Sequence, residues 1–220
     1  MKPYGSDCLP VDLMQTELIH SLEGSGLSCI RDDRVLFEQL AFELVSGQIL
    51  LLEGKNGSGK TSLLRILCGF REPDAGAIRW CGDAVKDSRF FAQMAYVGHL
   101  DGIKKELTVL ENLKMSLALS SPGRYSINDA LTKIHLSGYD DVLVQTLSAG
   151  QKRRLSLARL LISENVLWIL DEPFTSLDKQ GIALIEMLMT EHCANGGMIV
   201  LTSHHDIDLH DVDVQRINLS

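Results

Sequence analysis

The chain lacks any apolar run that approaches the roughly 20 residues needed to cross a lipid bilayer. Residues 1–5 also lack the start of a signal-peptide core. We therefore expect a chain that is soluble by itself and that reaches a membrane only through a partner. Internal repeats and low-complexity tracts are absent as well. The length of 220 residues suits one large domain, or a domain with a subdomain.

Cysteine and positive charge are both scarce in this sequence. The five cysteines are an odd number, are widely scattered and include no C-x-x-C pair. A reducing cytosolic compartment is the simplest explanation, and none of them is expected to bind a metal. The chain carries 21 basic against 29 acidic residues, a net charge of −8. Because sequence-independent binding to nucleic acid needs a basic face, no nucleic-acid partner is expected.

Apolar periodicity divides the chain into strand-rich, helical and mixed parts. We predict strands at 26–30, 35–44, 48–53, 77–81, 95–97, 166–170 and 198–202. Helices are predicted to begin at 62 and 108 and to span 126–136, 148–161 and about 179–192. Residues 1–25 are interpreted as a frayed N-terminal extension. The pattern indicates one α/β domain at 26–220, with a helical subdomain inserted at about 100–163.

Between a predicted strand and a predicted helix lies the pattern G-x-x-x-x-G-K-[ST], a phosphate-binding loop. It comprises Gly54, Lys55, Asn56, Gly57, Ser58, Gly59, Lys60 and Thr61, and Ser62 follows it. Its glycines let backbone N–H groups turn toward an anion, and the next helix points its partial positive charge at the phosphates. Lys60 can pair with the β- and γ-phosphates, and the Thr61 hydroxyl can bind Mg²⁺. An ordinary glycine-rich turn is the alternative, but both flanks favour a nucleotide site.

Two carboxylates, Asp171 and Glu172, follow directly after the apolar strand at 166–170. Ligands of open α/β sheets bind at the carboxyl ends of the strands, so both acids are predicted to lie beside the phosphate loop. Asp171 is then placed to hold Mg²⁺ through water, and Glu172 to orient and deprotonate an attacking water. The alternative is a pair of N-capping acids, since Pro173 and a turn follow.

The predicted helix at 148–161 begins with the sequence LSAGQ, at residues 147–151. A helix that starts with Ser148 and Gly150 can present its N–H groups to an anion. Lys60 and the end of the sheet already hold the phosphates of the chain's own nucleotide. The anion is therefore inferred to be the γ-phosphate of a second subunit's nucleotide. An ordinary serine N-cap explains the same residues.

These motifs fall in the order and spacing of an ABC-type ATPase, which the chain resembles from about residue 26 to 220. They are the phosphate loop, LSAGQ at 147–151, LDEP at 170–173, SLD at 176–178 and TSH at 202–204. The resemblance implies a P-loop NTPase (RecA-like) core with an antiparallel β subdomain and an inserted helical subdomain. It also implies a head-to-tail homodimer that sandwiches two ATP molecules between phosphate loops and opposing signature helices.

The same resemblance implies roles for individual residues at the dimer interface. Ser148, Gly150 and Gln151 take the signature positions that face the partner's nucleotide. Asp178 takes the position that links the two sites. His204 matches a switch histidine that reaches the γ-phosphate and positions the catalytic carboxylate and its water.

Two positions depart from the family pattern, and a second histidine needs an explanation. His99 stands where most relatives carry the glutamine that contacts Mg²⁺; a neutral imidazole can still bind the ion or its waters, whereas a protonated one would repel it. Arg31 aligns with the aromatic residue that usually stacks on adenine, and a guanidinium can also stack on a base. His205 follows His204 directly, but a metal-binding pair is the weaker alternative because adjacent side chains diverge.

A narrower resemblance concerns the partner of such a transport ATPase. Residues 98–104, 147–154 and 167–175 resemble the ATP-binding subunits of the haem exporter of cytochrome c biogenesis. This implies the integral membrane subunits of that haem-export complex as partners, and a peripheral place on the cytoplasmic side of the bacterial inner membrane. The alternatives are the ATPase subunit of another ABC transporter and a soluble ABC ATPase that acts on a macromolecular complex. A nucleotide kinase shares the phosphate loop, but its function does not require the sequence LSAGQ at 147–151.

Overall fold

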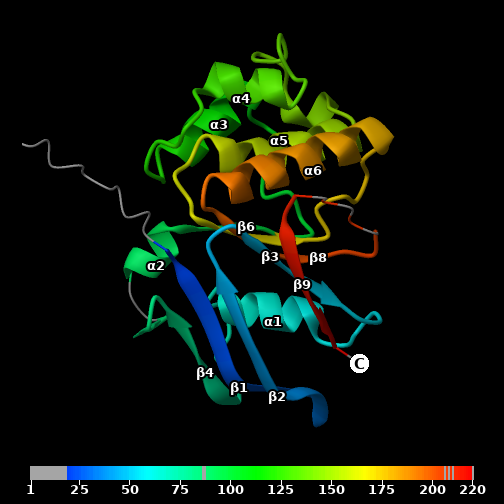
Figure 1. The fold of residues 1–220 in the computed structure, drawn as a ribbon. Helices are drawn as coiled ribbons and strands as arrows, with labels where there is room; N and C mark the ends of the chain where they lie inside the picture. The colour runs from blue at the N-terminus through cyan, green and yellow to red at the C-terminus, as the bar shows by residue number, and fades with distance from the viewer. Residues whose placement is uncertain (1–18, 86–87, 206, 208, 210, 220) are drawn as a thin grey trace, which may run out of the picture.

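The strands form two sheets in the computed structural model, which describes residues 19–85, 88–205, 207, 209 and 211–219 (Figure 1). The antiparallel sheet has the order β2-β1-β4-β5, with β1 (Ser21–Arg31), β2 (Arg34–Val45), β4 (Ala75–Trp80) and β5 (Asp83–Ala84). The parallel sheet has the order β6-β7-β8-β3-β9, with β6 (Met94–Val97), β7 (Leu167–Asp171), β8 (Met198–Thr202), β3 (Gln48–Glu53) and β9 (Asp213–Asn218). The predicted α/β class, with an antiparallel subdomain beside a parallel core, is confirmed.

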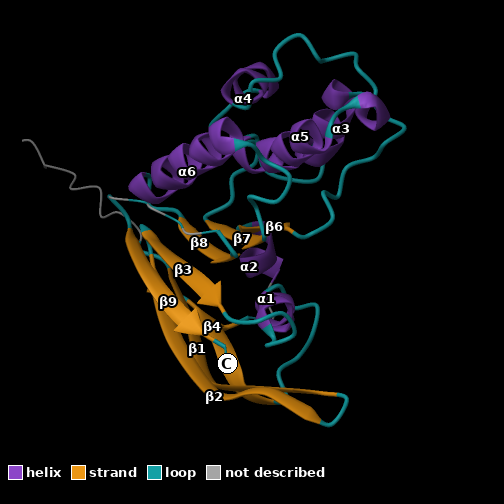
Figure 2. Cartoon of the chain, turned by 90° about the vertical axis from the view of Figure 1, so that its right-hand side faces the viewer, coloured by secondary structure: helices purple, strands orange, loops and turns teal. Residues whose placement is uncertain are grey.

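The helices cover the parallel sheet on both faces (Figure 2). They are α1 (Lys60–Leu67), α2 (Ser88–Ala92), α3 (Val109–Leu117), α4 (Ile127–Lys133), α5 (Ala149–Leu161) and α6 (Lys179–Ala194), with a short 3-10 helix at Val144–Thr146. α1 lies between the two sheets, and α3 to α6 gather on the opposite face of the parallel sheet. None of the helices in the described part of the chain is both long and apolar enough to cross a membrane.

The strand before the phosphate loop is apolar at consecutive positions because both of its faces are buried. Ile49 and Leu51 pack into the core beneath α5 and α6, whereas Leu50 and Leu52 pack against α1 and the antiparallel sheet. β3 pairs in parallel with β8 on one side and with β9 on the other. This central position fixes the start of the phosphate loop at the carboxyl edge of the sheet.

Side-chain caps set where the helices begin. Thr108 Oγ1 accepts a hydrogen bond from Glu111 N, and the Glu111 carboxylate accepts one from Thr108 N, so the predicted capping box before α3 is confirmed. Ser126 Oγ caps α4 by accepting a hydrogen bond from Asp129 N, and these two described residues lack the reciprocal bond of a capping box. These caps satisfy N–H groups that have no partner within the helix.

The structure differs from the predicted elements at the start and end of the chain. β1 begins at Ser21, so residues 21–25 of the predicted extension pair with β2 and β4. A Cβ on Gly24 would lie 2.4 Å from Phe42 Cε1, so this glycine permits close packing within the sheet. The short elements β5, α2 and β9 were not predicted, and residues 1–18 of the expected extension lie outside the described residues.

Candidate active site

The phosphate loop links β3 to α1 through three glycines in the left-handed region of backbone space. Gly54, Gly57 and Gly59 have φ values of +138°, +81° and +109°, which other residues rarely adopt. A Cβ on Gly54 would also lie 2.1 Å from the carbonyl oxygen of Leu219, whereas Gly57 faces open space. Within the described chain, the buried Ser58 Oγ has no hydrogen-bond partner. A cradle without Cβ atoms at its three glycines, with a buried hydroxyl in need of a partner, fits a phosphate group.

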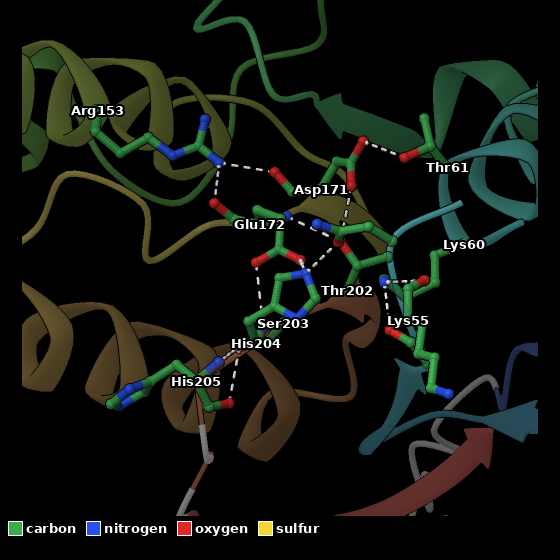
Figure 3. A network of polar contacts seen from close by, with 12 residues as sticks. Lys55, Lys60, Thr61, Arg153, Asp171, Glu172, Thr202, Ser203, His204 and His205 are labelled. Carbon is green, nitrogen blue, oxygen red and sulfur yellow. Dashed lines mark hydrogen bonds and ion pairs between the residues drawn. The ribbon is translucent and has the colours of Figure 1, made fainter. Parts of the chain in front are cut away.

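Lys60 and Thr61 start α1 and lie at the mouth of this cradle (Figure 3). The Lys60 ammonium donates hydrogen bonds to the carbonyl oxygens of Gly54 and Lys55, at 2.6 and 3.3 Å. It therefore stays over the loop, where a phosphate can replace these carbonyls as its acceptor. Thr61 Oγ1 donates to Asp171 Oδ2 at 3.2 Å, which joins the helix start to the end of β7. Ser62 follows in the first turn and is half-buried.

Asp171 ends β7 and is almost fully buried, at 5% exposure. Its Oδ1 accepts a hydrogen bond of 2.7 Å from the hydroxyl of Thr202, at the end of the neighbouring β8. Thr202 Oγ1 in turn accepts a 3.0 Å bond from the backbone N–H of Glu172. One hydroxyl thus fixes the ends of both strands, and the predicted juxtaposition of phosphate loop and acidic pair is what the structure has. Sequence reasoning did not identify the structural role of Thr202.

Glu172 has an unusual backbone conformation, with φ at +52°. A non-glycine residue there costs about 1–3 kcal/mol and persists only where its surroundings hold it. Here the N–H donates to Thr202, and the carbonyl accepts bonds from the Arg153 guanidinium at 2.8 Å and from Thr175 N at 3.2 Å. The side chain is 22% exposed, so it reaches solvent at the sheet edge. This arrangement turns the carboxylate toward the phosphate loop.

His204 connects this carboxylate to the loop (Figure 3). Its backbone N–H donates to Glu172 Oε2 at 3.2 Å, and its Nε2 lies 3.5 Å from Glu172 Oε1. The same Nε2 lies 3.0 Å from Asn56 Oδ1. Both neighbours are acceptors, which assigns a proton to Nε2. His205 points elsewhere: its ring packs near Phe174, so no histidine pair forms at this site.

The LSAGQ residues form a capping box at the start of α5. Ser148 Oγ accepts from Gln151 N at 3.2 Å, and Gln151 Oε1 accepts from Ser148 N at 2.8 Å. Ser148 is exposed, so the helix start faces solvent. A Cβ on Gly150 would lie 3.0 Å from the carbonyl oxygen of Ser176. Asp178 caps α6, with its Oδ1 accepting from Gly181 N at 2.8 Å.

The two departures from the family pattern lie apart from these bonds. His99 is exposed two residues beyond β6, and within the described chain it makes no hydrogen bond or ion pair with Thr61 or Asp171. Arg31 ends β1 and forms an exposed ion pair of 3.5 Å with Asp32. The structure therefore adds no support to a metal contact by His99, and the stacking of Arg31 on adenine stays a prediction.

The model of the ABC transporter family matches residues 37–175 of the chain. The chain belongs to the ABC transporter family. As an ATP-binding subunit of an ABC transporter it is an ATPase, and neither a soluble non-transport ATPase nor the ATPase subunit of another kind of ABC transporter is favoured.

Individual members of the ABC transporter family show how far the likeness extends. The cytochrome c biogenesis ATP-binding export protein CcmA of Vibrio vulnificus is 47% identical over 202 residues, covering 90% of this chain and 98% of that protein. The protein of the same name from Methylococcus capsulatus is 50% identical and covers 89% and 96%. A solved ATP-binding subunit of an ABC transporter is 28% identical with a TM-score of 0.74 and covers 83% and 79%. A putative ABC transporter ATP-binding protein from Pyrococcus furiosus, 24% identical, has the same fold with a TM-score of 0.78 and covers 90% and 97%.

Proposed function

We propose that the chain is the ATP-hydrolysing subunit of a haem-export complex of cytochrome c biogenesis, with Glu172 as the general base. The observation that carries the catalytic part is the contact of His204 with both Glu172 and Asn56 of the phosphate loop. It holds the base and the phosphate cradle at one sheet edge. The export part rests on relatives of 43–50% identity that are named for cytochrome c biogenesis and match along nearly their whole length.

In this proposal a water attacks the γ-phosphorus of ATP. Glu172 orients the water and accepts its proton, a new oxygen–phosphorus bond forms, and the bond from the γ-phosphorus to the bridging oxygen of ADP breaks. Lys60 exchanges its loop carbonyls for the β- and γ-phosphate oxygens. His204 donates a hydrogen bond from Nε2–H to a γ-phosphate oxygen in place of Asn56 Oδ1, and its backbone N–H keeps the Glu172 carboxylate in position.

Mg²⁺ is proposed to bind between Thr61 and Asp171. A hydroxyl and a carboxylate are hard oxygen ligands, and Mg²⁺ commonly binds to one or two carboxylates together with substrate phosphates. Their present hydrogen bond of 3.2 Å places both oxygens on the same side of the loop. When bound, the ion would neutralise charge that develops on the phosphates.

Two copies of the chain are proposed to sandwich two ATP molecules, with Ser148, Gly150 and Gln151 facing the partner's γ-phosphate. The capping box does not exclude this role, because the cap uses Ser148 Oγ only as an acceptor. Its O–H remains free to donate to a phosphate oxygen. Asp178 lies at the start of α6, and its second carboxylate oxygen can bond across the interface.

The proposed membrane partners dock in a groove of about 760 Å³ between the parallel sheet and the helical subdomain. Its walls include Tyr96, Gly102, Met115, Leu119 and Arg159. Leu119 is 84% exposed and Met115 is 37% exposed, so the rim offers apolar surface to a helix end. We therefore propose a peripheral position for the chain on the cytoplasmic side of the bacterial inner membrane. The integral subunits of the export complex carry the cargo.

The test uses Glu172→Gln, which keeps the size of the side chain and removes its basicity. We expect ATP to bind with unchanged affinity, hydrolysis to fall at least 100-fold, and a closed dimer to accumulate with ATP. Steady-state phosphate release and size-exclusion chromatography with ATP measure these effects. Hydrolysis at the wild-type rate would refute the assignment of the base.

Purification from membranes tests the partners: recovery with a ribosome or DNA complex in place of integral membrane subunits contradicts the export part.

A further inference from the structure

Arg153 is a buried cation on α5. Its guanidinium forms hydrogen bonds with the end of β7 and the residues that follow, where Asp171 and Glu172 lie. Its side chain is 3% exposed. Nη2 donates to the carbonyl oxygens of Asp171 and Glu172 at 3.0 and 2.8 Å, and Nε donates to that of Pro173 at 3.1 Å. Three successive peptide groups are thus held by one side chain (Figure 3 shows the first two bonds). The middle one belongs to the strained Glu172.

The same guanidinium also holds the segment that follows β6. Nη1 donates to the carbonyl oxygen of Gly98 at 2.9 Å and to Asp101 Oδ1 at 3.3 Å. Further along α5, Arg159 donates to the carbonyl oxygen of Gly102 at 3.2 Å. α5 therefore binds residues 98–102 through two arginines. Gly102 and Arg159 also line the groove proposed for the membrane partner.

A guanidinium has five N–H donors in a rigid plane, and at Arg153 all five have an acceptor. Burial lowers the pKa of Arg153, and the neighbouring Asp101 carboxylate opposes that shift. A lysine offers three donors on one atom and cannot replace five bonds to two separate segments, 171–173 and 98–101. The site is thus specific for arginine and unsuited to a lysine of equal charge.

We propose that Arg153 is a positioning residue for hydrolysis, which fixes the Glu172 backbone relative to the signature helix and to residues 98–102. The inference rests on the proposed function, because it assumes that Glu172 is the base. Ser148, which begins the same helix, faces the partner copy. α5 therefore connects the two sites. A shift of this helix when Ser148 contacts the partner's phosphate would also move the backbone of Glu172 in this copy.

The test is Arg153→Lys in the full-length chain, measured by steady-state ATP hydrolysis and by titration with a fluorescent ATP analogue. We expect kcat to fall about 10- to 100-fold, because a small displacement of a catalytic group has an effect of this size. KM and the affinity for the analogue should stay within twofold, since the phosphate loop is not touched. A parallel change in kcat and KM would overturn the proposal, because a merely structural role affects both.

The matched control is Arg154→Lys, one position along the same helix. Arg154 donates to the carbonyl oxygens of Ile134 and His135, within the helical subdomain. We expect its kcat to stay within twofold of wild type, and an equal loss in both variants would overturn the proposal. If Arg153→Lys does not fold, Asp101→Asn removes the guanidinium's paired charge and should lower kcat about threefold to tenfold at constant KM; an unchanged kcat there overturns the proposal too.

Glu172→Gln in the same assay separates the two levels of inference. If Glu172→Gln hydrolyses ATP at the wild-type rate, the proposed function is wrong. If Glu172→Gln is inactive and Arg153→Lys matches wild type, only the positioning role of Arg153 is wrong.

Discussion

Replacement of Thr202 by valine tests how the ends of β7 and β8 are held together. The two side chains have nearly the same shape, and Thr202 is fully buried. The change removes the 2.7 Å bond to Asp171 Oδ1 and the 3.0 Å bond from Glu172 N. It leaves the Asp171 carboxylate with one donor fewer and the backbone N–H of the strained Glu172 without an acceptor.

The cost can be worked from these two bonds. A hydrogen bond to a charged group contributes about 1.5–3 kcal/mol, and one between neutral groups about 0.5–1.5 kcal/mol. Burying a methyl group in place of the hydroxyl offsets about 1 kcal/mol. Thr202→Val should therefore lower the free energy of unfolding by about 1–3.5 kcal/mol. For a chain of this size the melting temperature then falls by roughly 2–14 °C.

The assay is urea unfolding followed by tryptophan fluorescence, with ATP hydrolysis measured in parallel. Thr202→Ser is the control, because it keeps the hydroxyl and loses only a methyl group. We expect Thr202→Val to lose at least tenfold in kcat and Thr202→Ser to stay within about threefold. The reasoning is refuted if the free energy of unfolding of Thr202→Val lies within about 0.5 kcal/mol of the wild-type value. The loss of even one neutral hydrogen bond is expected to cost about that much or more. Equal destabilisation by the serine variant would refute it as well.

Three further predictions concern the phosphate loop, the signature helix and a half-buried histidine. Lys60→Ala should weaken ATP binding at least tenfold, about 1.4 kcal/mol, by calorimetry; unchanged affinity would contradict the phosphate contact. Ser148→Arg should lower hydrolysis at least tenfold with near-normal ATP binding by a single copy, and loss of that binding would contradict a contact made only to the partner's nucleotide. Burial lowers the pKa of His192 from 6.5 to about 4, so the unfolded chain binds this proton first as pH falls. Stability should then decrease by about 2 kcal/mol between pH 7.5 and 5, and a pH series of His192→Phe, which keeps the stacking on Trp168, should lack that decrease.

The sequence predicted the site well where chemistry requires particular residue types at fixed spacing. The loop at 54–61 needs glycines for its left-handed backbone, and Asp171 and Glu172 must end an apolar strand. Helix starts at Thr108 and Ser148 were predictable for a similar reason, because a capping box is a local arrangement of two side chains. In each case the signal lies within a few consecutive residues.

The contacts of Arg153 and Thr202 could not be predicted in the same way. Arg153 lies 55 residues from Gly98 and 19 from Glu172, and a basic residue on a helix is exposed by default. A possible signal was its place in LSAGQKRR, on the face of α5 that is otherwise apolar and buried. β9 was missed because its sequence DVQRIN has only two apolar residues, which an edge strand tolerates. β1 was predicted too short because a glycine in a strand can permit packing and does not always end it.

The left-handed backbone of Glu172 creates a conflict between the stability of the fold and the rate of ATP hydrolysis. Glycine at this position would release about 1–3 kcal/mol of strain, against about 0.4–1 kcal/mol for its greater freedom in the unfolded chain. The folded chain would lose a carboxylate that is partly open to solvent, together with its hydrogen bond from His204 N. Selection for thermal stability alone should therefore favour glycine at position 172 and yield proteins that are more stable but do not hydrolyse ATP. Any effort to make this ATPase more robust has to start elsewhere and leave position 172 as it is.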